Sequence, residues 1–170
     1  MRKMVTMAAT ALALTACDFK TAVTAENGSV TAASLTPPTA AEADKIVGDA
    51  YAAFTSGDAI KMMAHYAPTA LVIDAANNAP SSDRATITKW NADFAAMKPS
   101  DLVTNPRTVQ VLDADTIVSS GIAAFLADVA GRRQRVSVRY THVFQRQSDG
   151  RWLIVNEHNS IPPQPVAPGL

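Results

Sequence analysis

The spacing of apolar residues changes near residue 100, and this change divides the chain into a helical part and a stranded part. Between about residues 41 and 97, apolar side chains recur every three or four positions, as on one face of an α-helix. From about residue 104 onward, apolar and polar residues alternate, as in half-buried β-strands. Helices followed by consecutive strands are typical of the α+β class.

Three helices are expected in the first part. The first covers about residues 41–56, with an apolar stripe of Ile46, Val47, Ala50, Tyr51 and Phe54. Gly57 follows as a residue typical of helix ends.

The other two helices follow the first along the chain. Asp58 is expected to cap a short second helix whose Ile60, Met63 and Ala64 face inward. Ser82 is the expected N-cap of a third helix over residues 83–97, with Ile87, Trp90, Phe94 and Met97 on one face.

One buried strand is expected among the helices and four long strands after them. The early strand covers residues 70–74 and ends in a carboxylate, Asp74. The four later strands are expected at 104–112, 116–128, 134–147 and 152–159. The Asp149-Gly150 pair between the last two is a strong hairpin signal.

Composition limits the partners of the protein. The chain has 170 residues, and its 15 basic and 15 acidic residues give zero formal charge. Nucleic-acid binding normally needs a basic face, so no nucleic acid is expected. The folded domain is expected over residues 41–161, followed by a proline-rich tail over 162–170.

The N-terminus has the pattern of an export signal. Arg2 and Lys3 precede a short apolar stretch, and Leu-Thr-Ala-Cys at 14–17 resembles the lipobox of bacterial lipoproteins. The resemblance implies a signal peptide over 1–16, lipidation of Cys17, a flexible tether over 17–40 and a lipid-anchored place in the bacterial cell envelope. Asp18 resembles an inner-membrane retention signal, which favours that membrane, facing the periplasm. The alternative is an ordinary secreted protein with a chance cysteine.

Two stretches resemble a known family. Residues 57–74 follow the ketosteroid isomerase pattern of Gly-Asp, short helix, strand and aspartate. Residues 140–160 are similar to the final hairpin of SnoaL-like domains and of the association domain of calcium/calmodulin-dependent kinase. The chain is identified as a SnoaL-like member of the nuclear transport factor two superfamily. This implies a cone-shaped fold, with three N-terminal helices packed on a strongly curved, mainly antiparallel sheet around a small-molecule cavity.

The resemblance also implies roles for single residues. Asp74 falls on the catalytic base of the isomerase pattern. His142 falls where the isomerase has its acidic oxyanion donor, and Ala50 falls where it has a tyrosine. The candidate catalytic residues are therefore Asp74 and His142, with one oxyanion donor replaced and the other missing.

Strand alternation predicts which hairpin residues face the cavity. A two-residue turn at Asp149-Gly150 would pair His142 with Glu157, Phe144 with Val155 and Tyr140 with Asn159. A three-residue turn would instead bring Asn156 and His158 inside. Together with aromatic residues on the apolar faces of the helices, the first pairing gives these candidate ligand-binding residues: Tyr51, Trp90, Phe94, Tyr140, Phe144, Val155, Glu157 and Asn159.

The other face of the sheet is a candidate interface. In the first pairing, Val143, Trp152 and Ile154 point away from the helices. An exposed apolar cluster of this kind would suit a homodimer. The alternative is that a loop or the C-terminal tail covers it.

The candidate chemistry leaves three hypotheses open. The leading one is a domain that binds a small, mostly apolar ligand carrying a carbonyl, hydroxyl or carboxyl group. The second is a proton-transfer isomerase or hydratase in which Asp74 is the base and His142 the electrophilic partner; Asp74 could equally cap the 75–80 loop. The third is a non-catalytic dimerisation or scaffold module. No cofactor is expected, and the three histidines lack the spacing of metal ligands.

Overall fold

The computed structural model describes residues 36–77 and 79–162. The expected signal peptide, Cys17, Asp18, almost all of the tether and residues 163–170 of the tail lie outside the described residues. In the part that is described, no helix is both long enough and apolar enough to cross a membrane.

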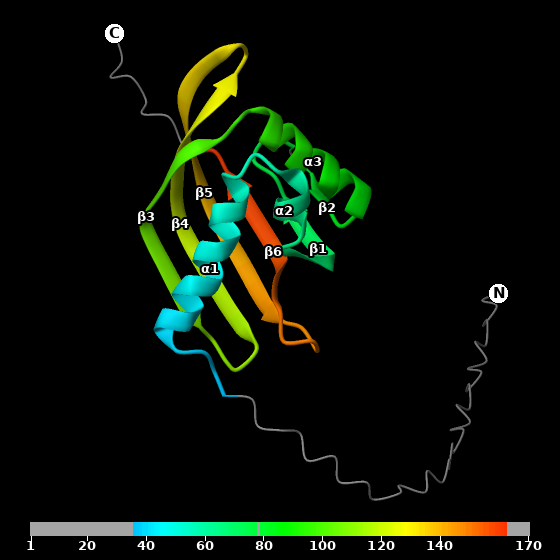
Figure 1. The fold of residues 1–170 in the computed structure, drawn as a ribbon, viewed down its shortest axis with the longest axis vertical. Coiled ribbons are helices and arrows are strands. Elements are labelled where there is room, and N and C mark those ends of the chain that lie inside the picture. The colour runs from blue at the N-terminus through cyan, green and yellow to red at the C-terminus, as the bar shows by residue number, and fades with distance from the viewer. Residues whose placement is uncertain (1–35, 78, 163–170) are drawn as a thin grey trace, which may run out of the picture. The chain divides into compact units, whose positions relative to one another are not determined.

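The core of the fold is one six-stranded sheet with the strand order β2-β1-β6-β5-β4-β3 (Figure 1). The strands are β1 (Tyr66–Ile73), β2 (Pro80–Ser81), β3 (Ser100–Val111), β4 (Thr116–Val129), β5 (Arg132–Arg146) and β6 (Trp152–Ser160). Only β1 and β6 pair in parallel, and every other neighbouring pair is antiparallel. The sheet is curled but not closed, which confirms the expected curved, mainly antiparallel α+β fold.

Three helices pack on this sheet, as expected: α1 (Ala40–Phe54), α2 (Ala59–Met63) and α3 (Arg84–Ala96). In Figure 1, α1 crosses one face of β3, β4 and β5, while α2 and α3 lie toward β1 and β6. A capping box between Thr39 and Glu42 starts α1. Its apolar stripe buries Val47, Ala50 and Tyr51 against the sheet.

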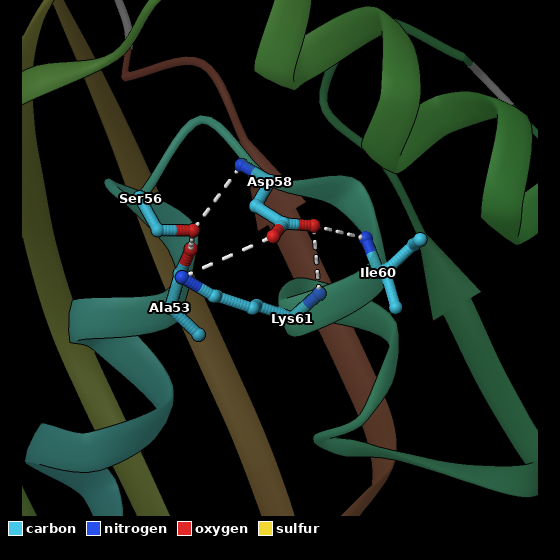
Figure 2. A network of polar contacts seen from close by, with 5 residues as sticks. All are labelled: Ala53, Ser56, Asp58, Ile60 and Lys61. Atoms are coloured by element: carbon cyan, nitrogen blue, oxygen red, sulfur yellow. Dashed lines mark hydrogen bonds and ion pairs between the residues drawn. The ribbon is translucent and has the colours of Figure 1, made fainter.

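The junction between α1 and α2 is built by hydrogen bonds to backbone groups (Figure 2). Asp58 caps α2 as expected, because its Oδ1 accepts from the backbone N–H groups of Ile60 at 2.9 Å and Lys61 at 3.2 Å. The hydroxyl of Ser56 donates to the carbonyl of Ala53, and accepts from the backbone N–H of Asp58. Gly57 takes a positive φ of 70° between them, a conformation that glycine adopts without strain.

Two details of the helix prediction are wrong. Ile60 is 83% exposed and Ala64 is also exposed, whereas Met62 and Met63 are buried. A helix of five residues makes little more than one turn, so tertiary packing and not periodicity decides which side is covered. The N-cap of α3 is Asp83 and not Ser82, because the Asp83 carboxylate accepts from the backbone N–H of Thr86.

The β5–β6 hairpin confirms the expected pairing away from its turn. Tyr140 lies opposite Asn159, and His142 lies opposite Glu157. Both His142 and Glu157 are buried, and His158 is exposed. The alternative with Asn156 and His158 facing the cavity therefore does not apply here.

Near the turn the predicted pairing is wrong. Phe144 lies opposite Ile154 and not Val155, and Arg146 lies opposite Trp152. The turn is longer than two residues, since the N–H of Gln147 donates to the carbonyl of Arg151 at 2.7 Å. A β-bulge at Val155 absorbs the extra residue and restores the expected register beyond it.

The bulge also changes which residues lie on the outer face. Ile154 has no exposed surface and belongs to the core, and Trp152 packs partly buried against the same core. Neither residue forms the exposed apolar cluster that strand alternation predicted, because the bulge reverses the alternation of β6 at Val155. Of the three expected residues, only Val143 keeps its outward place, between the inward-facing His142 and Phe144.

Candidate functional site

A cavity of about 260 Å³ lies between the inner face of the sheet and the helices. Strand β5 supplies alternate residues to its wall, namely Val136, Val138, Tyr140 and His142. Strand β4 adds Ala123 and Phe125, which lie opposite Val138 and Val136. The volume falls just below the range of about 300 to 1,000 Å³ that is typical of ligand pockets, so the space suits a small molecule.

Aromatic side chains form much of the cavity wall: Tyr51, Phe54, Tyr66, Trp90, Phe94, Phe125 and Tyr140. Phe94 and Phe125 meet edge to face, with ring centroids 5.4 Å apart. Tyr51 of α1 is held by a 3.0 Å hydrogen bond between its hydroxyl and that of Ser119 on β4. Because Ser119 has no exposed surface, this bond fixes α1 to the sheet from inside.

One end of the cavity carries a buried polar cluster, which we define as Tyr66, His142, Glu157 and Asn159. The hydroxyl of Tyr66 donates to Oε2 of Glu157, and Nδ2 of Asn159 donates to Oε1 at 2.5 Å. Nε2 of His142 lies 3.8 Å from Oε2 of Glu157, which is beyond hydrogen-bonding distance. The Glu157 carboxylate is thus 5% exposed and held by two neutral donors.

Arg84 on the first turn of α3 places Tyr66. Its guanidinium group donates to the carbonyl oxygens of Met63 at 3.0 Å, Tyr66 at 3.2 Å and Ala67 at 3.1 Å. These three bonds tie the start of β1 to α3 and so direct the Tyr66 side chain toward Glu157. Burial, together with the Glu157 charge, raises the pKa of the Tyr66 hydroxyl, so it stays protonated and remains a donor.

His142 is enclosed by aromatic rings and is electrically neutral at pH 7. Its ring centroid lies 5.1 Å from that of Tyr140, 5.7 Å from Tyr51 and 5.9 Å from Phe54. Burial lowers the pKa of the imidazole, against the opposing effect of the Glu157 carboxylate. Within residues 36–77 and 79–162, neither ring nitrogen of His142 nor the hydroxyl of Tyr140 has a hydrogen-bond partner. Buried polar groups of this kind normally have a partner, so a water molecule or a ligand atom can bind at this end of the cavity.

Asp74 combines both roles that the sequence left open. It lines the cavity, just beyond the end of β1. Its Oδ1 also accepts from the backbone N–H of Ala76 at 2.9 Å and from Nδ2 of Asn77 at 2.7 Å, as a loop cap does. Both hydrogen bonds engage Oδ1, so Oδ2 is the oxygen left for the cavity.

The structure places most of the predicted site residues on the cavity wall. Besides Asp74 and His142, these are Tyr51, Trp90, Phe94, Tyr140, Glu157 and Asn159. Phe144 and Val155 do not line the cavity. Phe144 is 1% exposed in the core, and Val155 is displaced by the bulge.

Sequence reasoning missed several wall residues, of which Tyr66 is the most important. The first strand was expected only from residue 70, whereas β1 begins at Tyr66. A single aromatic residue two positions before Pro68 carries no periodic signal, and only its burial beside β6, where it pairs with Ile154, shows that it points inward. Phe54 was recognised as a core residue but not as part of the wall, and Asn91 of α3 was not singled out.

The arrangement has the parts for binding and for proton transfer. It offers a carboxylate oxygen at Asp74, a neutral imidazole at His142 and an unpaired hydroxyl at Tyr140 inside an apolar space. Among the residues that the structure describes, no group of three histidine, cysteine or acidic side chains is placed to hold a metal ion.

Comparison with known proteins agrees with this architecture. The family model of the SnoaL-like domain matches residues 44–164. No curated protein is significantly similar to the chain. A solved structure from Xanthomonas campestris, described as a calcium/calmodulin-dependent protein kinase II association domain, has 32% sequence identity and a TM-score of 0.67. That match covers 75% of this chain and 90% of the other.

Two more distant structures share the fold. A Shewanella frigidimarina protein described as a ketosteroid isomerase has 17% identity and a TM-score of 0.59, over 69% of this chain and 94% of the other. The epoxide hydrolase/cyclase-like enzyme SalBIII, of pyran ring formation in the polyether salinomycin, has 14% identity and a TM-score of 0.55. The match covers 72% of this chain and 92% of that enzyme.

Proposed function

Because the chain belongs to the SnoaL-like family, whose fold holds a small-molecule cavity, we propose that this domain binds a small, mostly apolar ligand. One observation carries the proposal. The cavity wall is largely aromatic and aliphatic, yet at one end it contains buried polar atoms on Tyr140 and His142 that have no partner in the described part of the chain. A ligand with one polar group would satisfy these atoms while its apolar part fills the rest.

Filling the cavity tests the proposal. Ala123 lines the cavity, whereas its neighbour Ala124 faces the other side of β4. Ala123→Leu should therefore abolish the binding of small molecules that co-purify with the wild-type protein, as measured by native mass spectrometry. Ala124→Leu is the matched control and should leave them bound. Equal occupancy in both variants, or no small molecule at all under native conditions, would contradict the proposal.

A second candidate function is proton transfer with Asp74 as general base. It is supported by the position of Asp74 on the cavity wall with only Oδ1 engaged by the 75–80 loop. It also draws on the isomerase and cyclase-like enzymes that share the fold. His142 would then donate or accept a hydrogen bond at the reacting oxygen.

Two substitutions of Asp74 separate the base from the loop cap. Asp74→Asn keeps an oxygen that can accept from Ala76 and Asn77 but removes the base, whereas Asp74→Ala removes both. If Asp74 is a base, both variants lose turnover of an isomerisable ketone, and only Asp74→Ala also unfolds at a lower temperature. Turnover that survives in Asp74→Asn would exclude the catalytic role. If neither function holds, the domain remains a candidate scaffold module.

We also propose that the chain is anchored to the bacterial cell envelope through lipid on Cys17, on the inner membrane as Asp18 favours. The support is the pattern of residues 1–17 alone. Wild-type protein should incorporate palmitate in growing bacteria and fractionate with membranes, and Cys17→Ser should do neither. Labelling of Cys17→Ser would refute the anchor.

A further inference from the structure

The cavity has an acidic wall, and this limits the ligands that it can hold. Its wall contains two acidic side chains, Asp74 and Glu157. Within residues 36–77 and 79–162, no lysine or arginine lines the cavity. A ligand with a carboxylate would therefore place a third negative charge in an apolar space that contains no fixed positive charge.

Of the two acidic side chains, Glu157 is the more buried. It is 5% exposed, and its hydrogen-bond partners are the hydroxyl of Tyr66 and the amide of Asn159, which are both neutral. Among the described residues, the nearest basic group is His142, whose Nε2 lies 3.8 Å from Oε2, and burial favours the neutral form of that ring. Buried carboxylates in proteins are normally paired with a cation, and this one has none among the described residues.

The rest of the wall suits a positive charge as well. Aromatic residues line the cavity, among them Phe54, Tyr66 and Trp90, and the π-face of an aromatic ring attracts cations. The neutral imidazole of His142 has an unpaired nitrogen that can accept a hydrogen bond, and so does the unpaired hydroxyl of Tyr140. An ammonium group offers only donors, so these two acceptors and the carboxylate match it in hydrogen bonding as well as in charge.

We propose that the cavity selects a small apolar amine, bound in its protonated form beside Glu157. The inference rests on the proposed ligand-binding function and names the chemical class of the ligand. The sequence allowed a ligand with a carboxyl group, whereas the acidic wall favours one with an ammonium group.

Three probes of similar size and different charge test the proposal: cyclohexylmethylamine, cyclohexylmethanol and cyclohexanecarboxylate. Isothermal titration calorimetry at pH 7 should give at least tenfold tighter binding for the amine than for the alcohol, with the carboxylate weakest. Glu157→Gln should lose most of this preference for the amine, because the carboxamide keeps the size of the side chain but not its charge. Ala124→Leu, on the outer face, should keep it.

The outcomes distinguish a failure of the amine selection from a failure of the ligand-binding function. If the alcohol or the carboxylate binds as tightly as the amine, the charge selection is wrong and the ligand-binding function stands. If none of the three binds, both fail. Should Glu157→Gln not fold, Asp74→Asn provides the second test, since its amide oxygen can still accept the loop hydrogen bonds. An amine preference that survives in Asp74→Asn would then leave Glu157 as the carboxylate that selects the amine, whereas a preference lost in Asp74→Asn would overturn the assignment to Glu157.

Discussion

His142 shows how burial alone can define the state of a side chain. It is 4% exposed, surrounded by aromatic rings, and lies 3.8 Å from a carboxylate that would favour its protonated form. Burial has the larger effect, so the pKa of the imidazole is lowered. A neutral histidine can both donate and accept a hydrogen bond, which is the property that a ligand-binding or proton-transfer site needs.

The buried neutral form of His142 predicts a loss of stability in mild acid. The unfolded chain takes up a proton near pH 6.5, whereas the folded ring resists protonation until a lower pH. The free energy of unfolding should therefore fall as the pH drops below about 6.5, by at most about 1.4 kcal/mol per pH unit for this one group. Urea unfolding of the wild type and His142→Gln between pH 7 and 5 measures this, and the variant should show the smaller slope.

His65 contributes to the same pH dependence. Burial also lowers the pKa of His65, so it contributes a slope of the same sign. His65→Gln should reduce the pH dependence independently of His142→Gln, since the two effects come from separate sites. An identical pH dependence in the wild type and His142→Gln would show that His142 does not resist protonation in the folded state.

At the scale of elements, the site depends on departures from regular strand geometry. The bulge at Val155 lets Ile154 join the core while Glu157 and Asn159 still reach the cavity. Gly121 of β4 lies opposite Tyr140, where the backbone of β3 comes close. A side chain at Gly121 would collide with the carbonyl oxygen of Pro106 and touch the hydroxyl of Tyr140 at 3.0 Å. A glycine is required here because of space and not because of its backbone angles.

Gly121→Ala should therefore destabilise the protein by about 1 to 3 kcal/mol, the usual cost of forcing extra atoms into a packed region. The colliding atom belongs to the backbone, so β3 itself has to move. Thermal and urea unfolding measure the change. Gly48→Ala on α1 is the control, because a Cβ there meets nothing within 4 Å, and the helix should gain slightly in stability. Equal stability of Gly121→Ala and wild type would mean that the close approach is not maintained in solution.

At the scale of the whole domain, the curled sheet has its helices on the inner face, so the outer face is the candidate interface. The expected Trp152 and Ile154 are absent from it, but Val143 remains and pairs with Val118 of β4. Both are partly exposed and flank Thr141 and Ser120. This is a smaller apolar area than the sequence indicated, and a homodimer through it stays a prediction.

A charged substitution on the outer face of the sheet tests the predicted dimer. Val143→Asp would place a carboxylate on the outer face, and both copies would bury that charge if the face is an isologous interface. Light scattering after size exclusion should give the mass of two chains for residues 36–170 of the wild type and of one chain for the variant. Gln145→Asp, at an exposed position on the same strand, is the control. A monomeric wild type would refute the interface.

Much of the fold and part of the site could be predicted from the sequence, because they depend on local patterns. The change of spacing near residue 100 fixed the order of helices and strands, and Asp58 could be recognised as a cap from its position. Alternation along β5 correctly placed Tyr140 and His142 on the inner face. The proposed lipid anchor also rests on sequence alone, since Cys17 lies outside the described residues.

The tertiary structure decided what depends on long-range pairing. The length of the turn at Gly150 and the bulge at Val155 offset each other in register, and only the paired strands show where each occurs. The parallel pairing of β1 with β6 brings Tyr66 to Glu157, 91 residues away. The acidic residues of the cavity could be predicted from the sequence. That no lysine or arginine of the described chain lines the same cavity could not. Packing alone buries Glu157 beside a neutral His142 and leaves it without a cationic partner in the described part of the chain.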